Sequence, residues 1–62
     1  MRIGFIYFNK VTEQVESVYL SMTDFDKTEE AYNKAENVIF KHLYPGKPYN
    51  NEINIINYCI LR

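Results

Sequence analysis

The run RIGFIYF at residues 2–8 constrains the fold of this chain more than any other feature. If the run is extended, its odd-numbered side chains share one face of a sheet and its even-numbered side chains share the other. Both sets are apolar apart from one glycine: Ile3, Phe5 and Tyr7 on one face, and Gly4, Ile6 and Phe8 on the other. A strand with water on one face normally alternates apolar and polar residues. The run therefore predicts a central strand that meets the core on one face and a partner on the other.

The size of the chain also points to a partner. Its 62 residues form one domain, and a chain this short buries only ~60% of the surface that its unfolded form exposes. Such domains usually need a disulfide, a metal or a second chain for stability. The sequence has one cysteine, Cys59, and one histidine, His42, so we expect no internal disulfide, no metal site and no cofactor. Of these three sources of stability, binding to another chain is the one that remains.

Charge and hydropathy narrow the class of partner. The net charge is −1, whereas nucleic-acid-binding domains are normally basic, so we expect no direct contact with nucleic acid. The sequence contains no apolar run of membrane-spanning length. Its start lacks the features of a signal peptide, and a single unpaired thiol fits a reducing compartment. These features favour a cytoplasmic protein that binds another protein.

The pattern of the whole chain predicts an α+β domain of order β-β-α-β. Residues 2–8 and 15–22 form a hairpin, residues 25–43 form an amphipathic helix that ends before Pro45-Gly46, and residues 52–62 form a last strand. We expect a three-stranded antiparallel sheet of order 2-1-3 with the helix on one face. The alternation slips within the last strand, because of either a bulge or the burial of both faces.

The expected core joins the hairpin and the last strand to the helix. Val18, Leu20, Ile53 and Ile55 are predicted to pack with Tyr32, Ala35, Val38 and Ile39. The helix begins among residues that favour an N-terminus: Thr23, Asp24 and Asp26 are good N-caps, and Asp26 with Glu29 resembles a capping box.

The candidate partner-binding residues are four acids and two tyrosines. The acids crowd the start of the predicted helix, where they stabilise the helix dipole and could also meet a basic partner. Tyrosines are enriched at interfaces. The full set is Asp24, Asp26, Glu29, Glu30, Tyr7 and Tyr19.

The sequence shows no catalytic constellation, so we expect no enzyme. A free cysteine in a strand, such as Cys59, is usually a small hydrophobic residue, and His42 suits the end of a helix, where a cation is favourable. RIGFIYF also differs from the aromatic RNA-binding strand of the RRM fold, because Ile3 separates the basic residue from the glycine.

The layout resembles the Dmd-type antitoxins of T-even-type bacteriophages. The resemblance lies in the opening strand IGFIYF, the helix segment AYNKAENVIFKHL and the terminal YCILR. It implies a non-enzymatic protein in the cytoplasm of a host bacterium. It also implies that the protein binds a messenger-degrading toxin of the RNase LS type and blocks its active-site groove. A structural or interaction homodimer, another phage anti-defence inhibitor and an RNA-binding module remain as alternatives.

Overall fold

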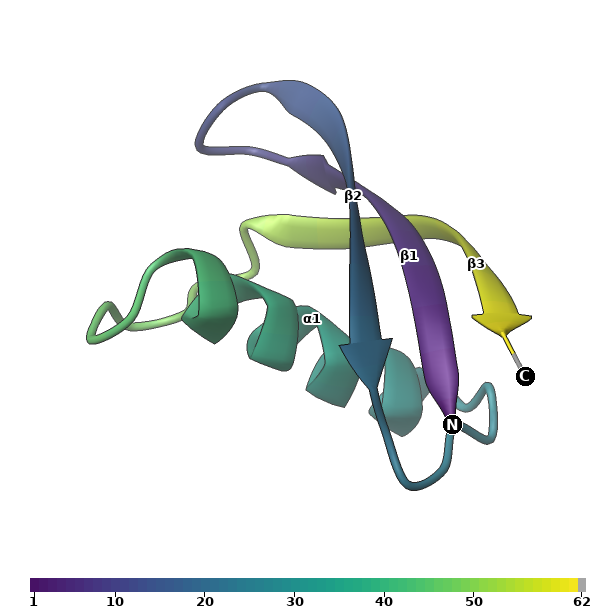
Figure 1. Ribbon diagram of the computed structural model, residues 1–62. Helices are drawn as coiled ribbons and strands as arrows, with labels where there is room; N and C mark the ends of the chain where they lie inside the picture. Colours follow the sequence, from purple (N-terminus) through teal and green to yellow (C-terminus); the bar gives the residue numbers. More distant parts are fainter. Residues whose placement is uncertain (62) are drawn as a thin grey trace.

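The computed structural model describes residues 1–61 and contains one sheet and one helix (Figure 1). The elements are β1 (Arg2–Asn9), β2 (Gln14–Ser21), α1 (Glu29–Leu43) and β3 (Ile53–Leu61). The strand order is β2-β1-β3, and both neighbours of β1 run antiparallel to it. The predicted α+β fold, its strand order and the central place of RIGFIYF are therefore confirmed. Arg62, at the end of the predicted last strand, lies outside the described residues.

A short turn at residues 10–13 joins β1 to β2. The side-chain oxygen of Asn9 accepts a hydrogen bond from Val11 N, and Glu13 N donates to Asn9 O over 2.7 Å. Glu13 has a φ of 57°, which closes the turn in the left-handed region. Asn9 is fully buried, and its amide nitrogen also donates to Glu16 and to the hydroxyl of Tyr44. This one side chain therefore links the hairpin to the end of α1.

The irregular pattern of β3 comes from a β-bulge. Ile6 pairs with Asn57 while its neighbour Tyr7 pairs with Ile55, which leaves Ile56 as the extra residue. The shift keeps Ile53 and Ile55 on the helix side before the bulge, and Tyr58 on the same side after it. Of the two explanations that the sequence left open, the bulge is the one the structure contains.

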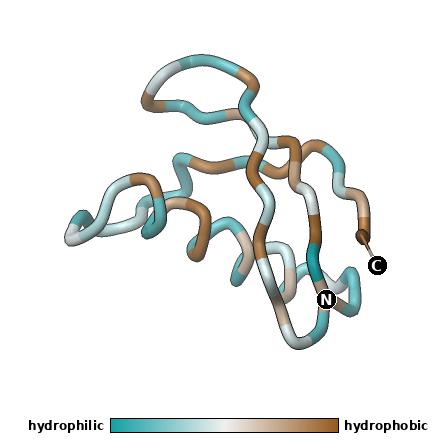
Figure 2. Tube along the Cα trace, viewed as in Figure 1, coloured by the Kyte–Doolittle hydropathy of each residue, from teal (hydrophilic) through white to brown (hydrophobic). Residues whose placement is uncertain are grey.

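The core lies between α1 and one face of the sheet. Its buried members come from four parts of the chain: Ile3, Phe5 and Tyr7 from β1, Phe25 from the loop before α1, Ala35, Ile39 and Phe40 from α1, and Ile53 from β3. Figure 2 shows hydrophobic residues gathered on the strands and on the helix, with a mostly hydrophilic connection after α1. The aromatic rings of Phe5 and Phe25 meet edge to face at 5.5 Å, a favoured geometry for buried rings.

Seven of the eight predicted core residues are buried or half-buried, and Val38 is the exception. The predicted set omits five buried residues: Ile3, Phe5 and Tyr7 of β1, Phe25 and Phe40. Val38 is 42% exposed, because α1 lies nearest to β3 and its flank toward β2 is uncovered. Phe40, on the other flank of the helix, is buried against the rings of Tyr44 and Tyr49. Phe25 is buried because the chain before the helix folds into the core rather than forming its first turn.

The helix begins four residues later than the sequence pattern predicted. Thr28 is the N-cap, and its hydroxyl accepts a hydrogen bond from Ala31 N over 3.1 Å. Asp26 lies before the helix and accepts from both the backbone and the hydroxyl of Thr28. These bonds hold the pKa of Asp26 below its usual value. The proposed Asp26–Glu29 capping box is therefore wrong, and Asp26 acts instead by orienting the true cap.

Candidate functional site

The face of the sheet opposite α1 has no element of the described chain over it. We call it the open face. By the pairing of the strands its central part consists of Gly4, Ile6, Phe8, Val15, Ser17, Tyr19, Asn54, Asn57 and Cys59, and its end consists of Arg2, Ser21 and Leu61. None of the nine central residues carries a full charge at neutral pH, and Arg2 is the one charged residue at the end of the face. Ile6 is 42% exposed, Val15 61% and Tyr19 68%. The apolar second face of RIGFIYF is thus open to solvent in the isolated chain.

Tyr19 shapes the middle of the open face by lying across Gly4. A Cβ atom added at Gly4 would meet ring atoms of Tyr19 at 3.1 and 3.3 Å, which is tighter than ordinary van der Waals contact. The absence of a side chain at Gly4 therefore lets the ring lie close to the sheet. A shallow hollow beside the ring is lined by Ile6, Cys59 and Leu61, among others.

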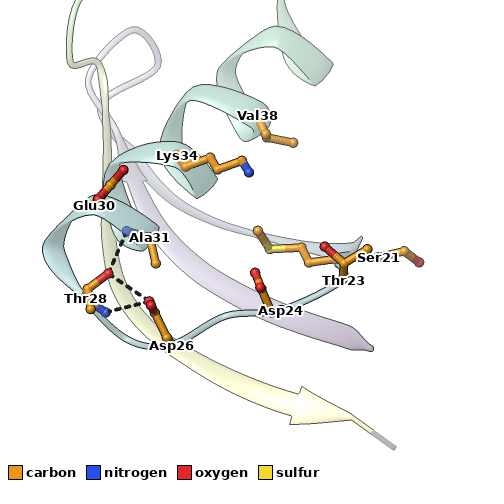
Figure 3. Close-up of a pocket in the computed structure, with 10 residues that line it drawn as sticks. Ser21, Thr23, Asp24, Asp26, Thr28, Glu30, Ala31, Lys34 and Val38 are labelled. Carbon is orange, nitrogen blue, oxygen red and sulfur yellow. Dashed lines mark hydrogen bonds between the residues drawn. The ribbon is translucent and has the colours of Figure 1, made fainter.

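A second hollow lies on the helix side of the sheet, between the end of β2 and the first turns of α1 (Figure 3). We call it the acidic groove. Its lining residues are Ser21, Met22, Thr23, Asp24, Asp26, Thr28, Glu30, Ala31, Lys34 and Val38. Lys34 is the one basic residue among them. The groove and the open face lie on opposite sides of the sheet.

The structure divides the six predicted partner-binding residues among four places, one of which is the core, where Tyr7 lies. Asp24, Asp26 and Glu30 line the acidic groove, while Glu29 is exposed in the first turn of α1 outside that lining. Tyr19 lies on the open face. The six residues therefore do not form one surface.

Tyr7 is a correction to the predicted site. Its exposed fraction is 1%, because it shares the helix-facing side of β1 with Ile3 and Phe5. Burial, together with a hydrogen bond to the Glu16 carboxylate, raises the pKa of Tyr7 to about 12. In this fold Tyr7 stabilises the core and is not available to a partner.

The open face also contains residues that were not nominated from the sequence. Ile6 and Val15 are exposed apolar side chains there, and neither was among the predicted partner-binding residues. The alternation of β1 already placed Ile6 on the second face. The same alternation in β2, counted from Tyr19, would have added Val15.

The structure does not bring Cys59 and His42 together. Cys59 is exposed on the open face, and His42 lies in the last turn of α1, so the sheet stands between them. No three His, Cys, Asp or Glu side chains of the described chain are grouped as metal ligands. None of its helices has the length and apolar character needed to cross a membrane.

Comparisons with protein-family models, with curated proteins and with solved structures found no match to this chain. The choice of function therefore depends on the geometry of the open face and of the acidic groove. Of the two, the open face is the larger departure from what a small domain in water requires, since a solvated sheet face is normally polar.

Proposed function

We propose that this protein is a non-enzymatic inhibitor that binds a protein partner through the open face. The observation that supports the proposal is the exposure of Ile6, Val15 and Tyr19 on one uncovered side of the sheet. Contiguous apolar surface on a small domain usually marks an interface. Tyrosine is a frequent anchor at such interfaces, since it supplies a large apolar area and a polar tip.

The partner class comes from the resemblance to Dmd-type antitoxins. We propose a bacterial messenger-degrading toxin of the RNase LS type as the partner, with the complex formed in the host cytoplasm. The open face would cover the toxin's active-site groove. Direct RNA binding has less support, because Arg2, at the end of the open face, is the one basic residue that the strand pairing places there, and several would be needed to neutralise phosphates.

In this proposal the four acids act by long-range electrostatic attraction of the toxin. A ribonuclease cleft must be basic to hold RNA, so Asp24, Asp26, Glu29 and Glu30 would attract it at a distance. Because they lie away from the open face, they should affect the association rate more than the final affinity. Asp26 and Glu29 also have structural roles at the start of α1.

An RNA-cleavage assay with such a toxin tests the proposal. We expect cleavage to stop when the protein approaches an equimolar ratio to the toxin, because a one-to-one complex blocks the active site. Charge reversal of the four acids should slow the onset of inhibition in low salt and leave the endpoint nearly unchanged. Full cleavage at a several-fold molar excess of the protein, with toxins from several host strains, would refute the antitoxin function.

A further inference from the structure

The two edges of the sheet differ in whether they can accept another strand. At the β3 edge, three outward-facing backbone groups already have side-chain partners. Ile55 N donates to the Glu36 carboxylate over 3.1 Å and Tyr58 N donates to Asn57 Oδ1 over 2.8 Å. The carbonyl of Ile53 accepts from the Tyr49 hydroxyl over 3.1 Å. Together with the bulge, these bonds block the addition of a strand at β3.

The β2 edge has no such protection. The pair next to the end of β2 shows which of its backbone groups face outward. Met1 and Met22 exchange two backbone hydrogen bonds, at 2.7 and 2.8 Å, and so form a hydrogen-bonded pair of the ladder between β1 and β2. Hydrogen-bonded pairs alternate along an antiparallel ladder, so the backbone groups of every second residue of β2 point away from β1. The residues concerned are Val15, Ser17, Tyr19 and Ser21. In the described chain no hydrogen bond to another part of the molecule involves them.

The side chains of β2 do not discourage pairing either. The strand contains one charged residue, Glu16, and no proline, whereas natural edge strands are usually blunted by lysine, proline or bulges. On the helix side, Val18 and Leu20 are only half-buried, because α1 lies nearest to β3. A strand beside β2 would cover backbone groups and these apolar side chains at the same time.

We infer that the β2 edge is a self-association surface, at which β2 of a second copy of this chain pairs antiparallel to form a six-stranded sheet. With one edge open and the other blocked, such pairing closes as a twofold dimer and does not continue into a filament. The dimer leaves β1, at the centre of each open face, free for another partner.

The backbone pattern selects one register. When Val18 of one copy faces Val18 of the other, Ser17 pairs with Tyr19 and Val15 pairs with Ser21. All four outward-facing residues of each copy are then paired. A register centred on Ser17 would instead pair Ser21 with Glu13, which lies in the turn.

The charge of Glu16 favours the same register. With Val18 at the twofold axis, the two Glu16 residues are four positions apart along the strands, or about 13 Å. With Ser17 at the axis they would be about 7 Å apart, and like charges that close repel. The chosen register also places Val18 against Val18, which is an apolar contact.

Cross-linking tests both the dimer and its register. In a Cys59→Ala background, Val18→Cys should form a disulfide-linked dimer on mild oxidation, because facing residues in a non-hydrogen-bonded pair have Cα atoms about 4.5 Å apart. Val15→Cys is the matched control. Val15 is the more exposed side chain, but the two copies of it would be about 20 Å apart, so it should stay monomeric. Equal cross-linking of the two variants would show random collision and overturn the inference.

Sedimentation equilibrium gives an independent test without cysteines. The wild-type chain should be dimeric at high micromolar concentration. Ser17→Pro should be monomeric and folded, since the lost N–H points away from β1 and proline is tolerated at such edge positions. Ser17→Ala, which keeps the N–H, should remain dimeric. A wild-type chain that is monomeric up to millimolar concentration, or a Ser17→Pro dimer as stable as that of the wild type, would refute the β2 pairing.

Discussion

Replacing Ile39 with alanine should lower the free energy of unfolding by about 2–5 kcal/mol. Ile39 is fully buried and lies at the middle of the α1 face that packs on the sheet. The substitution removes three carbon atoms from a close-packed site, and the cavity adds to the lost transfer free energy. For a 62-residue chain, whose total stability is at the low end of the usual ~5–15 kcal/mol, this loss could unfold the domain.

Val38→Ala is the matched control for Ile39→Ala. Val38 is the preceding residue of the same helix, but it is 42% exposed, so its truncation should cost about 1 kcal/mol or less. Urea denaturation followed by circular dichroism measures both variants. Equal losses of stability in the two variants would mean that the buried face of α1 is assigned wrongly.

Ile6→Asp should weaken the inhibition of a toxin by about 30-fold or more, which corresponds to the ~2 kcal/mol of a hot-spot residue. Ile6 lies on the central strand at the middle of the open face, where a partner would exclude water. A carboxylate there would be buried without a charged neighbour, because the residues opposite Ile6 are Ser17 and Asn57. In the free protein the same carboxylate would remain solvated, so the fold should persist.

Val11→Asp provides the control for Ile6→Asp. Val11 is 56% exposed but lies in the turn between β1 and β2, outside the open face. The two variants carry the same change of charge and of side-chain type. Inhibition titrations on variants with native circular dichroism spectra compare them. If the Ile6→Asp protein inhibits as well as the Val11→Asp protein, the open face does not bind the toxin.

The sheet was predictable because its signals are local. The run at residues 2–8 is apolar on both faces, which favours a central strand. The change of parity among the apolar residues of 53–60 indicated either a bulge or the burial of both faces, and the structure contains the bulge. Tyr7 shows the limit of this approach. Its parity with Ile3 and Phe5 was visible, but which of the two faces α1 covers is set by packing, so an inward tyrosine was taken for a contact residue.

The helix start and the division of the acids could not be predicted from the sequence. Several neighbouring residues are good N-caps, and the choice of Thr28 depends on Phe25 entering the core, which is a tertiary contact. The four acids are close in sequence, yet they lie partly before the helix and partly on it. Their separation from Tyr19 follows from the position of α1 under the sheet.

Mapping the contact surface by amide and methyl resonances of the labelled protein, with and without the toxin, tests the central claim most directly. The account predicts that the largest changes fall on Gly4, Ile6, Tyr19 and Cys59. Residues of the acidic groove, such as Asp24 and Lys34, should change little. Changes confined to the acidic groove and the first turns of α1, with the open face unaffected, would contradict it.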